Sequence, residues 1–182
     1  MTKSNPRVLK LMLFRHAKSS WGDPGLDDRD RPLNARGKSA AQAMGRVMRH
    51  RGLLPELVLC SPARRAKDTW SIAAGELKTA PKIAFEEDVY DFGNGGKLVE
   101  LIRTKGGKSQ SLLLVGHNPS MERLAQRLTG KGDKKLRERL EKKYPTGALA
   151  VFDAELDSWA DFAEAAFSIA HFIRPRDVTT AD

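Results

Sequence analysis

The chain has 182 residues and a formal net charge of +9, from 32 Lys and Arg residues against 23 Asp and Glu residues. Hydrophobic residues make up 40% of it and charged residues 30%, which excludes an intrinsically disordered chain and predicts one folded domain with a real core. No apolar run approaches the roughly 20 residues that cross a bilayer, so we expect no membrane partner.

The two ends of the chain indicate where the folded domain begins and ends, and the single cysteine indicates the cellular compartment. Residues 1–7 are polar and lack the apolar core of a signal peptide, so we predict a flexible N-terminus before a domain over residues 8–175. Residues 176–182 are predicted to form a flexible tail. Cys60 follows three apolar residues, which favours a buried structural thiol over a nucleophile. A single cysteine excludes an internal disulfide framework and predicts a cytoplasmic protein.

The first informative stretch is the apolar run from Val8 to Phe14, which ends abruptly in Arg15 and His16. The run is too short for a core helix and predicts a buried strand. A strand that stops here places Arg15 and His16 at its carboxyl end, the edge where ligands bind in open α/β sheets. This stretch alone supports equally well the alternative that both side chains are simply exposed to solvent at the end of the strand.

A loop rich in Gly, Pro and Asp follows over residues 22–37. Asn34 is a suitable N-cap for a helix that we predict to reach about Arg51. The next short apolar run, Leu57–Cys60, predicts a second buried strand.

A second helix is predicted directly after this strand. Ser61 suits its N-cap and Pro62 its first helical position. Arg64 and Arg65 then fall in the first turn, where cations are unfavourable because the helix N-terminus is itself positive. Two arginines there indicate an anionic ligand, unless one or both merely point into solvent.

The pattern of apolar residues that predicts strands and helices is weaker between residues 80 and 110. Residues 83–85 predict a third short strand, and residues 98–102 predict a short helix after a cluster of glycines. The segment 105–110 is predicted to be a loop.

The second informative stretch begins with the apolar run Leu112–Val115, which predicts a central strand. Gly116 ends it and His117 follows at once. Asn118 as N-cap and Pro119 at the first helical position then predict a helix that extends to about residue 128. His117 therefore lies between the carboxyl end of a strand and the amino end of a helix, where anions bind readily.

The last third of the chain predicts two further strands, at residues 148–152 and 167–173. Residues 130–143 are basic and only weakly amphipathic, which favours a solvated helix over a stripe that binds nucleic acid.

The alternation of strands and helices predicts a single α/β domain, with a mostly parallel central sheet and helices on both faces. In such a sheet the carboxyl ends of the strands meet at one edge, which brings His16 and His117 together with Arg15 and Arg65. Two imidazoles and several guanidinium groups predict a pocket for a phosphoryl group.

Two further considerations narrow the chemistry. The sequence holds no GxxxxGK[ST] loop, and an arginine cluster disfavours a metal cation at His16 and His117. A neutral imidazole is a competent nucleophile toward phosphorus, and neighbouring arginines would lower its pKa and keep it unprotonated.

Three segments of the chain resemble the signatures of the histidine phosphatase superfamily, in particular its SixA-like phosphohistidine phosphatase branch. They are LFRHAKS at 13–19, SPARRAKDT at 61–69 and VGHNP at 115–119. The segments DRDRPLNARG at 28–37 and PTGALAVFD at 145–153 also resemble that branch. The resemblance covers residues 8–175 and implies the phosphoglycerate mutase-like fold.

The resemblance also implies a role for each pocket residue. His16 corresponds to the nucleophile that accepts the phosphoryl group, with Arg15 beside it. Arg65 corresponds to the functional arginine of the second motif, and His117 to the second pocket histidine. Arg15, Arg65 and His117 would bind phosphoryl oxygens. Glu87 is the best positional match to the acidic proton donor that many members place after the third strand.

The implied activity is that of a phosphatase without metal or organic cofactor, which forms a covalent phosphohistidine and acts on phosphohistidine in proteins. The alternatives are a phosphatase for a small phosphomonoester or phosphoramidate, and a non-catalytic phosphate-binding module. The charge of +9 also allows a nucleic-acid binder, but aromatic residues are sparse at 7%, which weakens base stacking. We therefore expect a phosphorylated protein or small molecule as partner; the natural substrate and the oligomeric state stay open.

Overall fold

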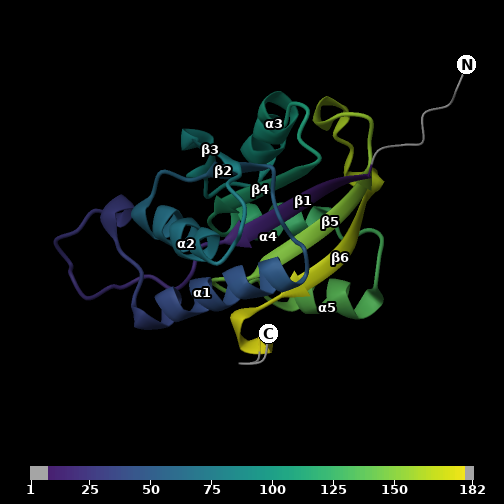
Figure 1. Ribbon diagram of the computed structural model, residues 1–182. Coiled ribbons are helices and arrows are strands. Elements are labelled where there is room, and N and C mark those ends of the chain that lie inside the picture. Colours follow the sequence, from purple (N-terminus) through teal and green to yellow (C-terminus); the bar gives the residue numbers. More distant parts are fainter. Residues whose placement is uncertain (1–7, 179–182) are drawn as a thin grey trace, which may run out of the picture.

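Six strands form the central sheet of the protein, whose computed structural model describes residues 8–178 (Figure 1). The strands are β1 (Val8–Arg15), β2 (Leu57–Cys60), β3 (Lys82–Phe85), β4 (Ser111–Gly116), β5 (Leu149–Glu155) and β6 (Phe167–Ile173). Their order across the sheet is β3-β2-β4-β1-β5-β6. Strands β1 to β4 run parallel to one another, and of the six strands only β5 runs against the others, because it pairs antiparallel with both β1 and β6. The predicted mostly parallel α/β sheet is confirmed.

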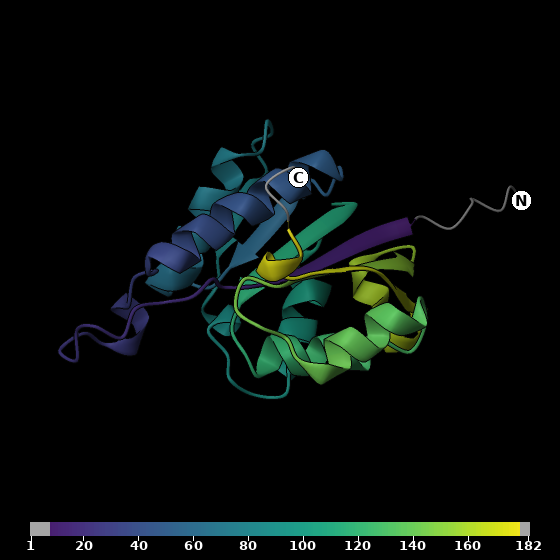
Figure 2. The ribbon, with the colours of Figure 1, turned by 90° about the horizontal axis from the view of Figure 1, so that it is seen from below.

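Five helices cover the two faces of this sheet, as the view from below shows (Figure 2). They are α1 (Ala35–His50), α2 (Arg64–Gly75), α3 (Gly96–Lys105), α4 (Ser120–Arg127) and α5 (Lys134–Lys142). The first two pack on one face, and the other three pack on the opposite face. The predicted cap of α1 is confirmed, because the side chain of Asn34 accepts a hydrogen bond from the Gly37 amide.

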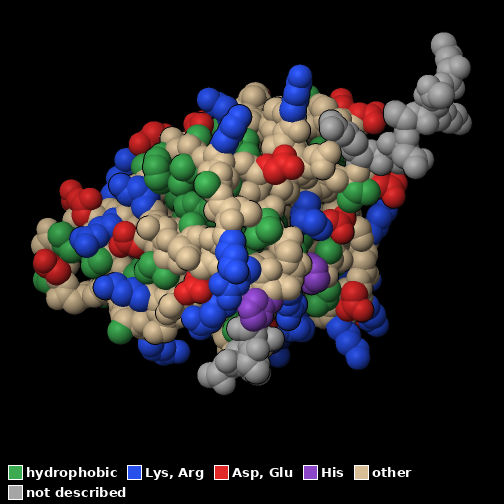
Figure 3. Space-filling model, in the orientation of Figure 1, with side chains coloured by type: hydrophobic (Ala, Val, Ile, Leu, Met, Phe, Trp, Pro, Cys, Tyr) green, Lys and Arg blue, Asp and Glu red, His purple; other side chains and the backbone are tan. Residues whose placement is uncertain are grey.

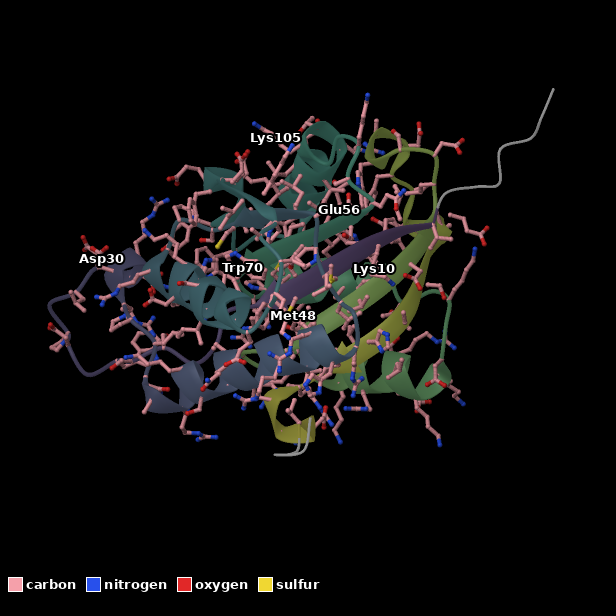
Figure 4. The ribbon with its side chains drawn as sticks, in the orientation of Figure 1. Lys10, Asp30, Met48, Glu56, Trp70 and Lys105 are labelled. Carbon is pink, nitrogen blue, oxygen red and sulfur yellow. The ribbon has the colours of Figure 1, made fainter. Side chains whose placement is uncertain are left out.

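The two cores follow from the alternation of side chains along each strand. In β1, Leu11 and Leu13 face α3, α4 and α5, whereas Met12 and Phe14 face α1 and α2. All four are fully buried, so the strand is apolar on both faces, as parallel strands covered by two helical layers are. Helices α1 and α2 contribute Met48 and Trp70 to the core on their side of the sheet, which also contains Met12 and Phe14 (Figure 4).

The predicted start of α2 is wrong by two residues. The helix begins at Arg64 with Ala63 at the N-cap, not with Ser61 and Pro62. The Ser61 hydroxyl accepts a hydrogen bond from the amide of Ala63 and lies 2.7 Å from a ring nitrogen of His117. It is therefore engaged in the site beside the helix rather than in capping it.

The predicted start of α4 is also too early. This helix begins at Ser120 with Pro119 at the N-cap. The side chain of Asn118 instead donates a hydrogen bond to the carbonyl of Tyr144, at 3.0 Å. Asn118 thus ties the loop before α4 to the loop before β5.

Several smaller expectations concern the termini, the thiol and the basic segment. Residues 1–7 and 179–182, which hold the predicted N-terminus and most of the tail, lie outside the described residues. Cys60 is fully buried, and its burial raises the pKa of the thiol to about 12, which agrees with the predicted structural thiol rather than a nucleophile.

The basic segment 130–143 contains α5, which buries Leu140. Lys and Arg side chains are dispersed among Asp and Glu over the face in Figure 3. No helix of residues 8–178 is long and apolar enough to cross a membrane.

Candidate active site

A cavity of about 400 Å³ opens at the carboxyl ends of β1, β2 and β4. It is lined by Arg15, His16, Lys18, Ser19, Trp21, Asp28, Arg31, Arg65, Phe92, His117, Asn118 and Thr146. The ring centroids of His16 and His117 lie 5.1 Å apart. The predicted meeting of both histidines with Arg15 and Arg65 at one edge of the sheet is therefore what the structure shows.

His16 presents a free nitrogen to the cavity. Its Nδ1 lies 2.7 Å from the carbonyl oxygen of Ala17, and because a carbonyl only accepts, Nδ1 carries the ring proton. Nε2 consequently keeps its lone pair. Burial lowers the pKa of His16 to about 3, against the effect of the Ala17 carbonyl, and the charges of Arg65, Arg15 and Arg31 lower it further. The imidazole is neutral at physiological pH, with burial rather than the arginines as the main cause.

His117 is the more deeply buried of the pair, with 1% of its surface exposed. Its Nε2 shares a hydrogen bond with the hydroxyl of Ser61, whereas its Nδ1 has no protein partner. Burial lowers its pKa to about 2, helped by His16 and Arg65. Because the Ser61 hydroxyl already accepts from the Ala63 amide, its own proton can go to Nε2, which leaves the ring proton on Nδ1. A buried donor without a partner is costly, so this N–H suits a ligand oxygen.

Arg65 is buried at the same site, where it holds Asp28. Its guanidinium donates to the backbone carbonyl of Asp28 at 2.5 Å and to Oδ2 of that residue at 2.9 Å. The same carboxylate accepts from Arg31 and from the hydroxyl of Tyr90. Burial acts to raise the pKa of Asp28, but the hydrogen bonds from Tyr90 and Arg65 prevail and lower it to about 2. Asp28 is thus an ionised carboxylate that occupies the guanidinium of Arg65.

Sequence reasoning missed Asp28, Arg31 and Ser61 as residues of the site. Arg31 is buried, and its guanidinium donates to Asp28 and to the hydroxyl of Ser19, at 2.9 Å and 2.6 Å. Asp28 and Arg31 both belong to the segment 28–37, which carried part of the family resemblance, so that segment was the available signal. Ser61 was interpreted only as a helix cap.

Glu87 is the one predicted site residue that the structure does not bring to the cavity. It lies in the short 3-10 turn η2 (Glu87–Val89), with 68% of its side chain exposed. Its carboxylate pairs with Arg29, and the hydrogen bond from Arg29 lowers its pKa. Glu87 is therefore ionised and turned toward an exposed arginine.

The charge of the lining suits an anion. Among the residues that the structure describes, the lining contains a single carboxylate, that of Asp28, and four basic side chains, which are those of Arg15, Lys18, Arg31 and Arg65. Within residues 8–178, no group of three or more His, Cys, Asp or Glu side chains is arranged to hold a metal ion. Guanidinium groups bind phosphoryl oxygens bidentately, so the lining can hold a phosphoryl group beside Nε2 of His16.

The two buried neutral histidines predict a loss of stability in mild acid. In the unfolded chain each titrates near pH 6.5, whereas in the folded protein the pKa values are about 3 for His16 and about 2 for His117. As the pH falls below 6.5, the unfolded state therefore binds protons that the folded state does not. Each histidine weakens folding by up to about 1.4 kcal/mol per pH unit. Thermal melting between pH 7.5 and 4.5 measures this slope.

The variant His117→Asn supplies the control for this slope. It is expected to melt with a shallower dependence on pH, because one of the buried histidines is gone. His171, whose pKa burial also lowers, contributes the same background to both proteins. A melting temperature that is constant from pH 7 to pH 5 in the parent protein would contradict the neutral buried pair.

Comparisons with known proteins show the family and the fold of this chain. A model of the histidine phosphatase superfamily (branch 1) matches residues 11–95. An uncharacterised protein of Mycobacterium tuberculosis is 34% identical over 165 residues, which cover 90% of this chain and 100% of that protein. A crystal structure assigned as the phosphohistidine phosphatase SixA of Agrobacterium tumefaciens is 29% identical, with coverage of 92% and 98% and a TM-score of 0.76. The alpha-ribazole phosphatase of Shigella flexneri shares the fold, with 16% identity, coverage of 92% and 97% and a TM-score of 0.59.

Proposed function

Because this chain belongs to the histidine phosphatase superfamily and is therefore a phosphatase, we propose that it hydrolyses phosphohistidine in proteins, with His16 as nucleophile. The observation that carries the proposal is the state of His16: neutral, with its proton on Nδ1 and a free lone pair on Nε2, in a cavity lined by arginines. Such an imidazole is activated without a separate base.

In the proposed reaction, Nε2 of His16 attacks the phosphorus atom while the bond from phosphorus to the substrate nitrogen breaks. The departing nitrogen keeps the electron pair of that bond. The other ring nitrogen of the substrate, protonated from solvent, lets the imidazole leave as a neutral molecule. Water then attacks the phosphorylated His16, the bond from phosphorus to Nε2 breaks, and one water proton passes to solvent. The products are the dephosphorylated substrate and inorganic phosphate.

The other pocket residues bind the group that is transferred. Arg15 and Arg65 contribute guanidinium groups to the lining, and His117 contributes its unpartnered Nδ1. We assign these three to the phosphoryl oxygens, where fixed positive charge in a partly dry cleft stabilises the charge of the transition state. A phosphoryl oxygen takes the place of the Asp28 carboxylate on Arg65. Positive charge in this lining also supports a reaction without a metal ion.

The protonation state of the acids favours a phosphorus–nitrogen bond as the one that is cleaved. Among residues 8–178, Asp28 is the sole carboxylate in the lining, and in the free protein its pKa of about 2 means that it holds no proton when the substrate enters. An alkoxide leaving group needs a proton from the enzyme, whereas an imidazole takes its proton from solvent. We therefore give Glu87 no part in the reaction and place phosphohistidine ahead of alkyl phosphomonoesters.

A panel of substrates tests this preference. With purified protein in EDTA, we expect kcat/KM for phosphohistidine and phosphoramidate to exceed that for a sugar phosphate by about a hundredfold or more, since general acid catalysis contributes at least that much. Glu87→Gln is expected to change these rates by no more than about twofold, as an exposed substitution does. A protein that prefers the sugar phosphate, or that loses most of its activity with Glu87→Gln, would show that an acid operates and that the substrate is a small phosphomonoester.

A further inference from the structure

Two large aromatic side chains stand exposed among the residues that line the catalytic cavity. Trp21 exposes 79% of its surface and Phe92 exposes 46%. Exposed side chains of this size are the exception in a folded protein and indicate a binding surface when they gather at a cavity. They come from separate parts of the chain, Trp21 from the loop after β1 and Phe92 from the loop before α3.

Trp21 lies on a rigid platform. The guanidinium carbon of Arg31 is 3.2 Å from the centroid of its ring system, which places one ring face on a buried cation. Arg31 is itself held by the carboxylate of Asp28 and the hydroxyl of Ser19. The indole is therefore supported from one side although most of its surface is open to solvent.

Phe92 is also supported from within the site. Its ring centroid lies 5.3 Å from that of His117, with 38° between the ring planes, and 4.9 Å from that of Tyr90 in an edge contact. These separations fall in the range of favourable aromatic pairs. The mouth of the cavity thus carries two ring systems, each of which packs on another residue of the cavity lining.

We infer that Trp21 and Phe92 form an aromatic mouth that stacks the planar leaving group of the substrate, the imidazole ring that carries the phosphoryl group. This inference rests on the proposed function, because it assigns the contacts of the part of the substrate that departs. An imidazole offers two ring faces to the mouth, and its protonated form adds a cation over an aromatic face. The amine of phosphoramidate or the chain of an alkyl phosphate has no such face.

A comparison of phosphohistidine with phosphoramidate isolates the contribution of the substrate's imidazole ring. Both contain a phosphorus–nitrogen bond, and they differ in the presence of the imidazole. For Trp21→Ala and for Phe92→Ala, we expect the ratio of kcat/KM on phosphohistidine to kcat/KM on phosphoramidate to fall by about three- to tenfold, the size of one aromatic pair. Trp21→Phe keeps a ring and should retain most of the ratio. Phe85→Ala, which removes an exposed ring of β3 outside the cavity lining, should leave the ratio unchanged.

A binding measurement covers the case in which turnover is too slow to compare. In the His16→Ala protein, which has no nucleophile, calorimetry gives Kd for both compounds, and the two aromatic substitutions should weaken phosphohistidine more than phosphoramidate by a similar factor. Equal losses on both compounds would overturn the inference, because the rings would then support only the phosphoryl site. A loss confined to a phosphorylated protein would overturn it as well, since the rings would then contact the protein surface. Inactivity of the wild-type protein with an intact binding ratio would refute the proposed function and leave the aromatic mouth in place.

Discussion

Replacing His16 with alanine is expected to abolish the phosphoenzyme and to lower kcat/KM on phosphoramidate by about four orders of magnitude or more, the scale on which a covalent mechanism responds to loss of its nucleophile. We propose that Nε2 of His16 accepts the phosphoryl group. The corresponding nitrogen of His117 is already engaged, because it shares a hydrogen bond with the hydroxyl of Ser61. We therefore propose that His117 binds phosphoryl oxygens and is not a second nucleophile.

Trapping with a phosphorylated donor, followed by mapping of the modified residue, checks this prediction directly. The label should be acid-labile and should lie on His16. His50→Ala is the matched control, because His50 is an exposed histidine at the end of α1, away from the cavity lining. Wild-type activity in His16→Ala would refute the proposed nucleophile. Tight phosphate binding without any phosphoenzyme in the wild-type protein would instead identify a non-catalytic phosphate-binding module.

The parts of the site that could be predicted from the sequence are those that depend on the backbone alone. The apolar run of β1 and that of β4 specify buried strands, and parallel neighbours must end at one edge. His16 and His117, each directly after such a strand, are therefore brought together by topology. The register confirms it, since Arg15 pairs with Gly116 as the last residues of the two strands.

The parts that could not be predicted depend on where side chains find distant partners. Ser61 was predicted to cap α2, but its hydroxyl meets His117, 56 positions along the chain. Glu87 was predicted as an acid of the site, but Arg29, 58 positions earlier, binds its carboxylate outside the cavity. A local pattern contains no information about such a competitor, so helix starts and loop side chains were the weak points of the prediction.

The order of the causes behind the pKa of His16 was also beyond the sequence. A cluster of arginines was expected to keep the imidazole neutral, and those charges do act in that direction. The largest cause is burial, because only 8% of His16 is exposed. Burial depends on how the loops close over the strand end, which no spacing of residues reveals.

Arg65 should be the second most sensitive residue of the site. We expect Arg65→Lys to lower kcat by about 100- to 1000-fold, because a single ammonium replaces a bidentate guanidinium at the transferred group. Arg64→Lys is the matched control, since Arg64 occupies the same helical turn but lies on the surface, 3.6 Å from Asp68. Steady-state kinetics on phosphoramidate measures both variants, with thermal melting to confirm that each remains folded.

Removing Arg65 altogether has a second consequence, which acts through Asp28. In Arg65→Met the carboxylate of Asp28 loses one of its two guanidinium partners and keeps Arg31, so it faces the incoming phosphoryl group with less of its negative charge balanced. The loss in kcat/KM should therefore exceed that of Arg65→Lys, and Asp28→Asn should restore part of it in the double variant. Since the two side chains are in contact, their effects should not add. Additive losses would mean that Asp28 does not compete with phosphate for Arg65, and that Arg65 reaches the substrate from another arrangement of the loop.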